Sequence, residues 1–219
     1  MLSMKDMKPF ALSLLIGVAV LLQCARAEAG PRETLVVAGG CFWCVEADFE
    51  RVEGVIEVVS GYTGGDVDNP TYKQVTRGGT GHYEAAEITF DADEVSREQL
   101  LEMFFRSIDP TDADGQFCDR GESYRTAIFV SDNAEKALAE EVKAEAQAEL
   151  GQKIVTPVLE ARKFWVAEDY HQDYYKSKEL VLTRAGPKSK ASAYKFYREA
   201  CGRDDKVREL WGSAAPFTG

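Results

Sequence analysis

The sequence is poor in the residues that build stapled or metal-rich folds. Its 219 residues include only five cysteines and two histidines, too few for a disulfide-dense scaffold or an array of zinc sites. It also lacks a basic excess, since 26 Lys and Arg stand against 37 Asp and Glu, for a formal net charge of −11. Because an acidic chain repels phosphate backbones, the composition argues against nucleic-acid binding. With 45% hydrophobic and 29% charged residues, the chain is expected to form one globular domain, at most two.

Long hydrophobic runs are also missing, apart from one near the N-terminus. Lys5 and Lys8 precede an apolar run over residues 10–22, and residues 25–27 read Ala-Arg-Ala. A basic start, an apolar run of this length and an A-x-A site are typical of a secretory signal peptide, and the run is too short for a transmembrane helix. We therefore expect residues 1–27 to be removed and the protein to be exported, periplasmic or secreted, with no membrane attachment afterwards. An N-terminal anchor that stays uncleaved is the alternative.

Removal of the signal peptide changes what the counts mean. It takes away three basic residues, one acidic residue and Cys24, so the remaining chain 28–219 carries −13 and four cysteines. The charge is uneven, because residues 187–219 sum to +3 while residues 28–186 carry about −16. We expect this basic segment to lie as an arm over the acidic body, and it is also a candidate docking surface for a partner. The four remaining cysteines are Cys41, Cys44, Cys118 and Cys201.

Strand and helix signals alternate along the rest of the chain. Short apolar or β-branched runs predict strands, and runs without Pro or Gly that carry apolar residues at helical spacing predict helices. Gly64, Gly65 and the Asn69-Pro70 pair mark a long loop. These signals predict one α/β or α+β domain. Strands are expected over residues 34–38, 55–62, 84–90, 124–130 and 154–159. Helices are expected over residues 42–52, 96–107 and 167–178, and a long helix is expected to begin at a cap formed by Ser131 and to end at residue 150.

The chemistry concentrates at residues 39–44, Gly-Gly-Cys-Phe-Trp-Cys. A strand, two glycines and then Cys41 in the first turn of a helix form a setting for a reactive thiol, because orphan backbone N–H groups and the helix dipole stabilise a thiolate. The competing interpretation is a buried structural cysteine among aromatic neighbours. The C-x-x-C pair formed with Cys44 favours redox or metal chemistry, and a disulfide between these two residues would be redox-active.

A metal site is not expected. Zinc would need a second C-x-x-C pair or paired histidines, and the remaining candidates stand at no ligand spacing. Those candidates are Cys118, Cys201, His82 and His171. No nucleotide cofactor is indicated, so electrons are expected to arrive as thiols.

Seven sequence blocks carry a family resemblance. They are Gly40-Cys-Phe-Trp43 with Val45-Glu46, Ser60-Gly-Tyr-Thr-Gly-Gly65, Asn69-Pro-Thr-Tyr72, Thr80-Gly-His-Tyr-Glu84, Asp109-Pro-Thr111, Asp119-x-Gly121 with Tyr124-Arg125, and Ala167-Glu-Asp-Tyr-His-Gln-Asp-Tyr174. In this order, over about residues 34–175, they resemble peptide methionine sulfoxide reductase of the A type. That enzyme class reverses the oxidation of methionine, with one enzyme type for each epimer.

The resemblance implies both a fold and an activity. The fold would be α/β (α+β), with a ferredoxin-like βαβ core, long loops and an irregular C-terminal tail over residues 187–219, in a single catalytic domain over residues 28–219. The activity would be thiol-dependent reduction of the S epimer of methionine sulfoxide, in exported proteins that have been oxidised. Whether the free amino acid is also a substrate stays open.

The resemblance makes Cys41 the nucleophile and Glu84 the general acid. The Cys41 thiolate would attack the sulfoxide sulfur and end as a sulfenic acid as methionine leaves. The sulfoxide oxygen must be protonated to leave, and the small apolar Ala85 and Ala86 form an environment that raises the pKa of a neighbouring carboxyl group. On the sequence alone, Glu84 would be interpreted as an exposed strand residue.

Five further residues are assigned to the substrate by the resemblance. Tyr72 and Tyr124 match hydroxyl donors to the sulfoxide oxygen, although the bare sequence would make them structural aromatics. Phe42 and Trp43 match the pocket for the substrate methyl group, a task that apolar ring faces suit. Asp119 matches a carboxylate near the substrate backbone and is equally compatible with a simple turn residue.

The thiol that resolves the sulfenic acid is the main open point. Many relatives carry Gly at the position of Cys44, and family members usually resolve with a cysteine in a C-terminal segment. Here that residue is Cys201, so a Cys41–Cys201 disulfide is expected, with Cys44 and Cys118 as alternative relay thiols.

Two other functions compete with this hypothesis. A thioredoxin-like thiol–disulfide oxidoreductase using Cys41 and Cys44 would explain the C-x-x-C pair, although Trp usually precedes the first cysteine there, whereas Trp43 lies between the two. The second competing function is a non-enzymatic exported binding module that uses its acidic surface and has structural cysteines. For a reductase, export to an oxidising compartment implies a thioredoxin-like dithiol partner, besides oxidised protein or peptide methionine sulfoxide as substrate, and a monomer is expected.

Overall fold

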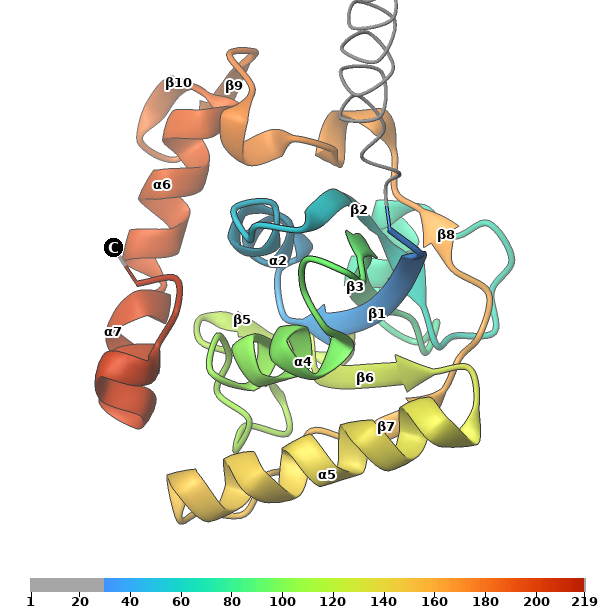
Figure 1. The fold of residues 1–219 in the computed structure, drawn as a ribbon. Helices are drawn as coiled ribbons and strands as arrows, with labels where there is room; N and C mark the ends of the chain where they lie inside the picture. Colours follow the sequence, from blue (N-terminus) through green and yellow to red (C-terminus); the bar gives the residue numbers. More distant parts are fainter. Residues whose placement is uncertain (1–29, 219) are drawn as a thin grey trace, which may run out of the picture. The chain divides into compact units, whose positions relative to one another are not determined.

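A six-stranded sheet runs through the computed structural model, which describes residues 30–218. The predicted signal peptide over residues 1–27 lies outside these residues. None of the helices in the described part has the length and hydropathy needed to cross a bilayer. The main elements are β1 (Arg32–Gly39), α2 (Phe42–Phe49), β2 (Val55–Thr63), α3 (Tyr72–Arg77), β3 (Tyr83–Asp91), α4 (Arg97–Phe105), β6 (Thr126–Val130), α5 (Asn133–Leu150), β7 (Val158–Glu160), β8 (Trp165–Val166), α6 (Lys190–Ala200) and α7 (Arg203–Trp211) (Figure 1).

The strand order confirms the expected core. The sheet runs β7-β6-β1-β3-β2-β8, and its central strands β6, β1, β3 and β2 pair antiparallel, whereas β7 joins β6 in parallel. Helix α2 connects β1 to β2, and α4 lies between β3 and β6 in the chain. Two βαβ crossovers that interleave into an antiparallel sheet are the ferredoxin-like arrangement, so the α/β prediction is confirmed.

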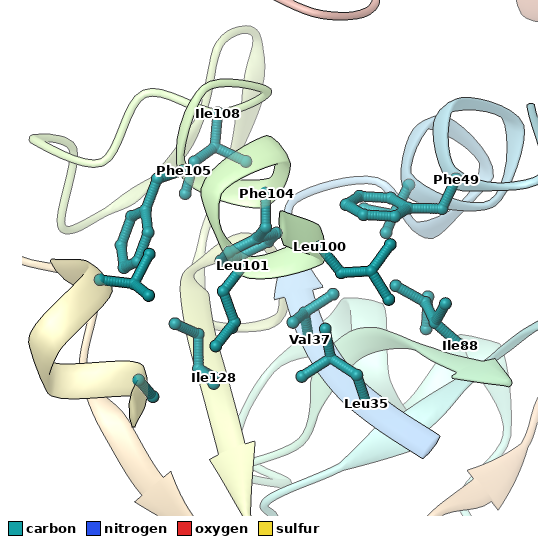
Figure 2. Packing of buried hydrophobic residues seen from close by; sticks show 14 of the residues in the cluster. Leu35, Val37, Phe49, Ile88, Leu100, Leu101, Phe104, Phe105, Ile108 and Ile128 are labelled. Carbon is teal, nitrogen blue, oxygen red and sulfur yellow. The ribbon is translucent and has the colours of Figure 1, made fainter. Parts of the chain in front are cut away.

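One face of the sheet carries the main hydrophobic core. Leu35 lies opposite Ile88, and Val37 lies opposite Ile128, so side chains two residues apart share a face. Helix α4 buries four large side chains against them, Leu100, Leu101, Phe104 and Phe105 (Figure 2). Helix α5 packs on α4 and contacts β6 and β7, as Figure 1 shows. The core therefore holds β1 in place, and its carboxyl end leads through Gly40 and Cys41 directly into α2.

Several predicted boundaries shift for local reasons. Asp132, not Ser131, caps α5, because its carboxylate accepts the N–H groups of Ala134 and Glu135, both at 2.8 Å. Helix α2 ends at Phe49, three residues early. Strand β7 begins only after Pro157, which has no N–H to give to a ladder.

The expected helix over residues 167–178 is wrong. Two short 3-10 turns, Asp169–His171 and Tyr174–Lys176, lie there instead. Asp173 between them has a φ of 54°, which a continuous α-helix cannot contain. The long loop expected after β2 conversely contains α3, whose capping box is formed by Thr71 and Gln74.

The prediction of an irregular C-terminal tail is also wrong. A hairpin of β9 (Leu180–Thr183) and β10 (Gly186–Ser189) leads into α6 and then α7. Val207 and Trp211, four residues apart on α7, are buried in the main core, so apolar burial stabilises this segment.

Candidate active site

Cys41 lies at the turn between β1 and α2, as its sequence context predicts. It is the N-cap residue of α2, and its carbonyl accepts the N–H of Cys44 at 3.0 Å. The turn depends on Gly40, whose φ is +82° and where an added Cβ would lie 2.6 Å from the Cβ of Gln116. No other residue fits this turn without strain, so the thiol is positioned by backbone geometry.

Cys41 and Cys44 form a pair of interacting thiols. A hydrogen bond with Cys44 and burial raise the pKa of Cys41, whereas the same bond lowers the pKa of Cys44 to about 7 against the effect of burial. Arg203 and Arg198 lower the pKa of Cys44 further. The expectation of a thiolate held at Cys41 by the helix N-terminus is therefore corrected: the two sulfurs share the proton, and the charge favours Cys44.

Glu84 lies on β3 directly beside the thiols' helix. It is only 1% exposed, and its Oε2 accepts the backbone N–H of Phe42 at 3.2 Å. Burial raises the pKa of Glu84 to about 8, and the Phe42 bond opposes this. Its other carboxyl oxygen, Oε1, is buried and has no hydrogen-bond partner among the described residues. Glu84 is therefore a buried carboxyl group that favours its protonated form at neutral pH. It is hydrogen-bonded to Phe42, the residue that follows Cys41.

Tyr72 and Tyr124 reach the same region from two separate elements. Tyr72 opens α3, where its N–H donates to Glu168 Oε1 at 3.0 Å, and Tyr124 ends the 3-10 turn Glu122–Tyr124. Burial and then the nearby Glu84 raise the pKa of both phenols. Both hydroxyl groups therefore keep their protons and are available as donors.

Phe42 and Trp43 form an aromatic wall next to the thiol. Phe42 is buried, with its ring centroid 5.1 Å from that of His171 and 6.4 Å from that of Tyr72. Trp43 stacks on Tyr174 at 3.8 Å with an angle of 11° between the rings. These contacts hold both rings rigidly.

A single cavity of about 540 Å³ gathers the predicted site. Asp119 lies on its wall from the short hairpin of β4 (Gly115–Gln116) and β5 (Asp119–Arg120), where burial raises its pKa and Arg203 opposes the rise. Every residue assigned from the sequence lines this cavity, namely Cys41, Phe42, Trp43, Cys44, Tyr72, Glu84, Cys118, Asp119, Tyr124 and Cys201.

The cysteine pairing differs from the one expected. Cys201 is bonded to Cys118, with their Cα atoms 4.9 Å apart, and among the described residues Cys41 and Cys44 are the free thiols. The bridge joins the β4–β5 hairpin to the junction of α6 and α7. The protein therefore presents one disulfide and one dithiol in the same cavity.

Three residues that support the site were given no role from the sequence. Glu168 accepts the Tyr62 hydroxyl at 2.9 Å as well as the Tyr72 N–H, and buried Glu46 accepts the Ser60 hydroxyl at 2.7 Å. Burial lowers the pKa of His171 to about 4, so this ring is neutral. All three lie inside the quoted blocks, which is the signal that could have found them.

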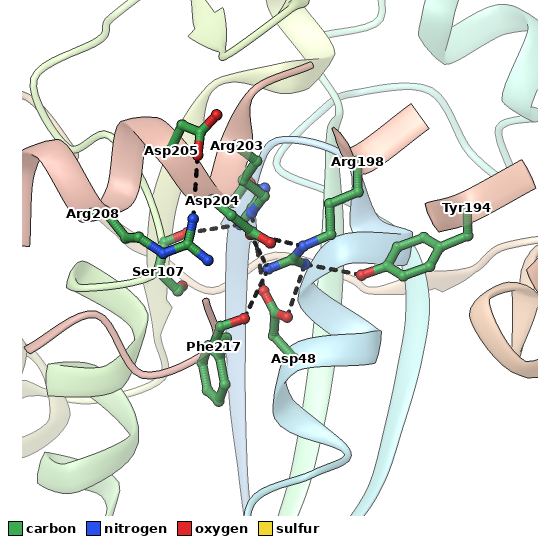
Figure 3. Close-up of polar contacts among 10 residues, drawn as sticks. Asp48, Ser107, Tyr194, Arg198, Arg203, Asp204, Asp205, Arg208 and Phe217 are labelled. Atoms are coloured by element: carbon green, nitrogen blue, oxygen red, sulfur yellow. Dashed lines mark hydrogen bonds and ion pairs between the residues drawn. The ribbon is translucent and has the colours of Figure 1, made fainter. Parts of the chain in front are cut away.

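The basic arm contacts the acidic body, but not as a free surface. Arg198 pairs with buried Asp48 at 2.8 Å, and Arg203 is 2% exposed. Both guanidinium groups point inward to the Asp48 carboxylate (Figure 3). Of the basic residues in segment 187–219, Arg198 and Arg203 are therefore unavailable to a partner, whereas Lys195 on α6 is exposed.

A pair of thiols, a buried carboxyl group with a raised pKa and two phenols line one cavity, a set of groups suited to thiol-based reduction with proton donation. Residues 33–203 match the family described as peptide methionine sulfoxide reductase. The chain belongs to this family, and its activity is the thiol-dependent reduction of methionine sulfoxide.

Relatives and solved structures support the same assignment. The chain is 48% identical to peptide methionine sulfoxide reductase MsrA 2 of Rhizobium meliloti, over 86% of this chain and 88% of the relative. It is 45% identical to MsrA 2 of Caulobacter vibrioides, over 90% and 94%. Its fold is similar to reduced Mxr1 of Saccharomyces cerevisiae, with a TM-score of 0.63 and 28% identity over 65% of this chain and 83% of that one. Methionine sulfoxide reductase A of Corynebacterium diphtheriae gives 0.59 and 30%, over 65% and 73%.

Proposed function

We propose that Cys41 carries out the reduction and that Glu84 supplies the proton. Cys41 passes its thiol proton to the Cys44 thiolate as its sulfur attacks the sulfoxide sulfur, and the oxygen passes to Cys41 with the proton that Glu84 donates. The products are a Cys41 sulfenic acid and a thioether, so the substrate sulfur gains two electrons and Cys41 loses two. The observation that carries this proposal is the buried, protonated Glu84, bonded to the residue next to Cys41, because the oxygen leaves only when protonated.

The remaining cavity residues orient the substrate. Tyr72 and Tyr124 donate to the sulfoxide oxygen as charge develops on it. Phe42 and Trp43 hold the methyl group by apolar contact, and Asp119 accepts from the substrate backbone, while the preference for the S epimer follows from membership of the family. The protonated states of the two phenols support their role as donors.

Cys44 is the thiol that we assign to the first resolving step. It lies in the same helical turn as Cys41 and shares a hydrogen bond with it. Its sulfur attacks the sulfenic acid, a Cys41–Cys44 disulfide forms, and the oxygen leaves as water. The role expected for Cys201 from the sequence then moves one step later.

The second step passes the oxidation from one cysteine pair to the other. A Cys118 or Cys201 thiolate attacks the Cys41–Cys44 disulfide, and its partner then closes the Cys118–Cys201 disulfide while Cys41 and Cys44 recover their protons. The result is the pairing described above, with one dithiol and one disulfide.

An external dithiol of the thioredoxin type is the proposed reductant. Cys118 is exposed, whereas Cys44 is buried, so an outside thiolate reaches the Cys118–Cys201 bridge first. We also propose that residues 1–27 direct export and that the substrates are oxidised exported proteins. The N-terminal mass of the protein recovered from outside the cytoplasm tests the export proposal, and a start at residue 1 would contradict it.

The Cys44 assignment is tested by trapping. Reduced Cys44→Ser protein, mixed with methionine sulfoxide and no other reductant, should form about one methionine and accumulate a Cys41 sulfenic acid that reacts with dimedone. Wild-type protein should give little adduct. Rapid formation of a Cys41–Cys118 or Cys41–Cys201 bridge in the variant would contradict the assignment. Turnover in Cys41→Ser would contradict the reductase mechanism itself and leave a different thiol chemistry.

A further inference from the structure

Arg203 is a buried cation whose place near the cavity is not explained by the steps above. Its side chain is only 3% exposed. Nη1 donates to the carbonyl of Gly39 at 3.2 Å and Nη2 to the carbonyl of Ser107 at 2.9 Å. A buried guanidinium is costly unless its donors are occupied, so these bonds fix its position.

Two further contacts surround the same guanidinium group. Its central carbon lies 4.8 Å from the centroid of the Phe117 ring, at a distance for a cation–π contact. Its Nε lies 3.9 Å from Oδ2 of Asp48, the carboxylate that also binds Arg198. Figure 3 shows Arg203 between Asp48 and Ser107.

Apart from the bond to Ser107, these contacts fall on the segments that carry the four cysteines of the described chain. Gly39 precedes Cys41 by two residues, and Phe117 directly precedes Cys118. Asp48 lies one helical turn beyond Cys44 on α2, and Arg203 itself follows Cys201 by two residues. One side chain therefore couples the β1–α2 turn, helix α2, the β4–β5 hairpin and the start of α7.

We propose that Arg203 is a positioning residue for the transfer of oxidation from the Cys41–Cys44 pair to the Cys118–Cys201 pair. This inference rests on the proposed two-disulfide sequence. Transfer requires a thiolate on one segment to approach a disulfide on another, and the rate falls steeply when such groups are misplaced by about 1 Å. Its positive charge lowers the pKa of Cys44, which makes the Cys44 sulfur a better leaving group when the Cys41–Cys44 disulfide is attacked.

The geometry requires arginine and not merely a cation. The planar fork reaches two carbonyl groups while its face stacks on Phe117, and a lysine ammonium cannot do both. Arg203→Lys therefore keeps the buried charge opposite Asp48 but loses the paired hydrogen bonds to the Gly39 and Ser107 carbonyl groups and the stacking on Phe117. Phe117→Leu removes the stacking and keeps the guanidinium.

The test separates the two phases of methionine formation. Fully reduced protein is mixed with excess methionine sulfoxide without external reductant, quenched at short times, and assayed for methionine and for each disulfide by mass mapping. The first methionine needs only Cys41, whereas the second needs Cys41 to be restored as a thiol by transfer of its oxidation through Cys44 to Cys118 and Cys201. In Arg203→Lys we expect the first phase within about threefold of wild type and the second at least about tenfold slower, with a smaller slowing in Phe117→Leu.

Arg208→Gln provides the matched control, because Arg208 lies exposed on the same helix and pairs only with Asp205 among the described carboxylates. Both its phases should equal those of wild type. Equal slowing of both phases in Arg203→Lys and Phe117→Leu, or no slowing in either variant, would overturn the proposal. A wild-type protein that forms no methionine would contradict the proposed function instead, so the two failures are distinguishable.

Discussion

Glu84 illustrates what burial does to a single residue. In the unfolded chain its carboxyl group ionises near pH 4.5, whereas burial raises the pKa of the folded group to about 8. A group with a raised pKa favours the folded state most at low pH, and this contribution is lost as the pH rises from about 4.5 through about 8. In the proposed mechanism the same proton goes to the sulfoxide oxygen, so stability and catalysis would share one titration.

Glu84→Gln should therefore slow the first methionine by about 100-fold or more at pH 7, since general acid catalysis contributes on this scale. Wild-type protein should lose this contribution as the pH rises through about 8, whereas the variant keeps only the pH dependence of the Cys41–Cys44 thiols. Rapid quench from pH 6 to 9 measures both. Glu87→Gln, on the same strand, is a control that should behave as wild type. A variant with a wild-type rate and an unchanged pH profile would contradict the role.

At the scale of elements, helix α2 is fixed to the C-terminal helices by a buried ion pair. Asp48 of α2 is 1% exposed, and Arg198 of α6 bonds both Asp48 at 2.8 Å and the Tyr194 hydroxyl at 2.9 Å. The basic arm thus packs on the acidic body, as its charge predicts, through contacts that only the fold defines.

Asp48→Ala should lower the free energy of unfolding by about 3 kcal/mol, near the lower end for a broken buried pair, because Arg198 keeps Asp204 as a partner. Glu209→Gln removes an exposed pair with Lys206 and should change it by no more than about 0.5 kcal/mol. Urea unfolding measures both. Equal changes in the free energy of unfolding for the two variants would show that the buried ion pair stabilises the fold no more than an exposed pair does.

How much the sequence predicts also differs between elements. Strands β1, β2 and β3 and helix α4 follow from apolar periodicity and a Ser96–Gln99 capping box, and the structure has them within about two residues. Helix α3 was missed although Thr71 and Gln74 form the same kind of box, because the glycines before it indicate a loop. The C-terminal helices depend on burying Val207 and Trp211 in the body, and that contact is not visible locally.

The site shows the same division. Cys41, Glu84 and the aromatic residues come from motif blocks and meet in one cavity. The pairing of Cys118 with Cys201 joins residues 83 positions apart, and no spacing rule predicts it. Arg203 carries no motif at all, because its importance comes from four segments that only the tertiary fold brings together.

At the scale of the whole molecule, the Cys118–Cys201 bridge closes a long loop of chain across the cavity. A cross-link over such a separation should raise the free energy of unfolding by about 2–4 kcal/mol. In a Cys41→Ser/Cys44→Ser background this bridge remains as the redox-active one, so adding dithiothreitol should lower stability by that amount. Cys118→Ser/Cys201→Ser protein should show no response to the reductant. An unchanged unfolding curve in the first protein would contradict the bridge.

The most direct test of the two-pair mechanism counts methionine. Fully reduced wild-type protein, given excess methionine sulfoxide and no external reductant, should form about two equivalents of methionine and end with two disulfides, because the four cysteines of residues 28–219 make two pairs. Cys118→Ser/Cys201→Ser should form about one equivalent and end with a Cys41–Cys44 bridge, and Cys41→Ser should form none. Continued methionine formation by Cys41→Ser, or a single equivalent from wild-type protein, would contradict the account.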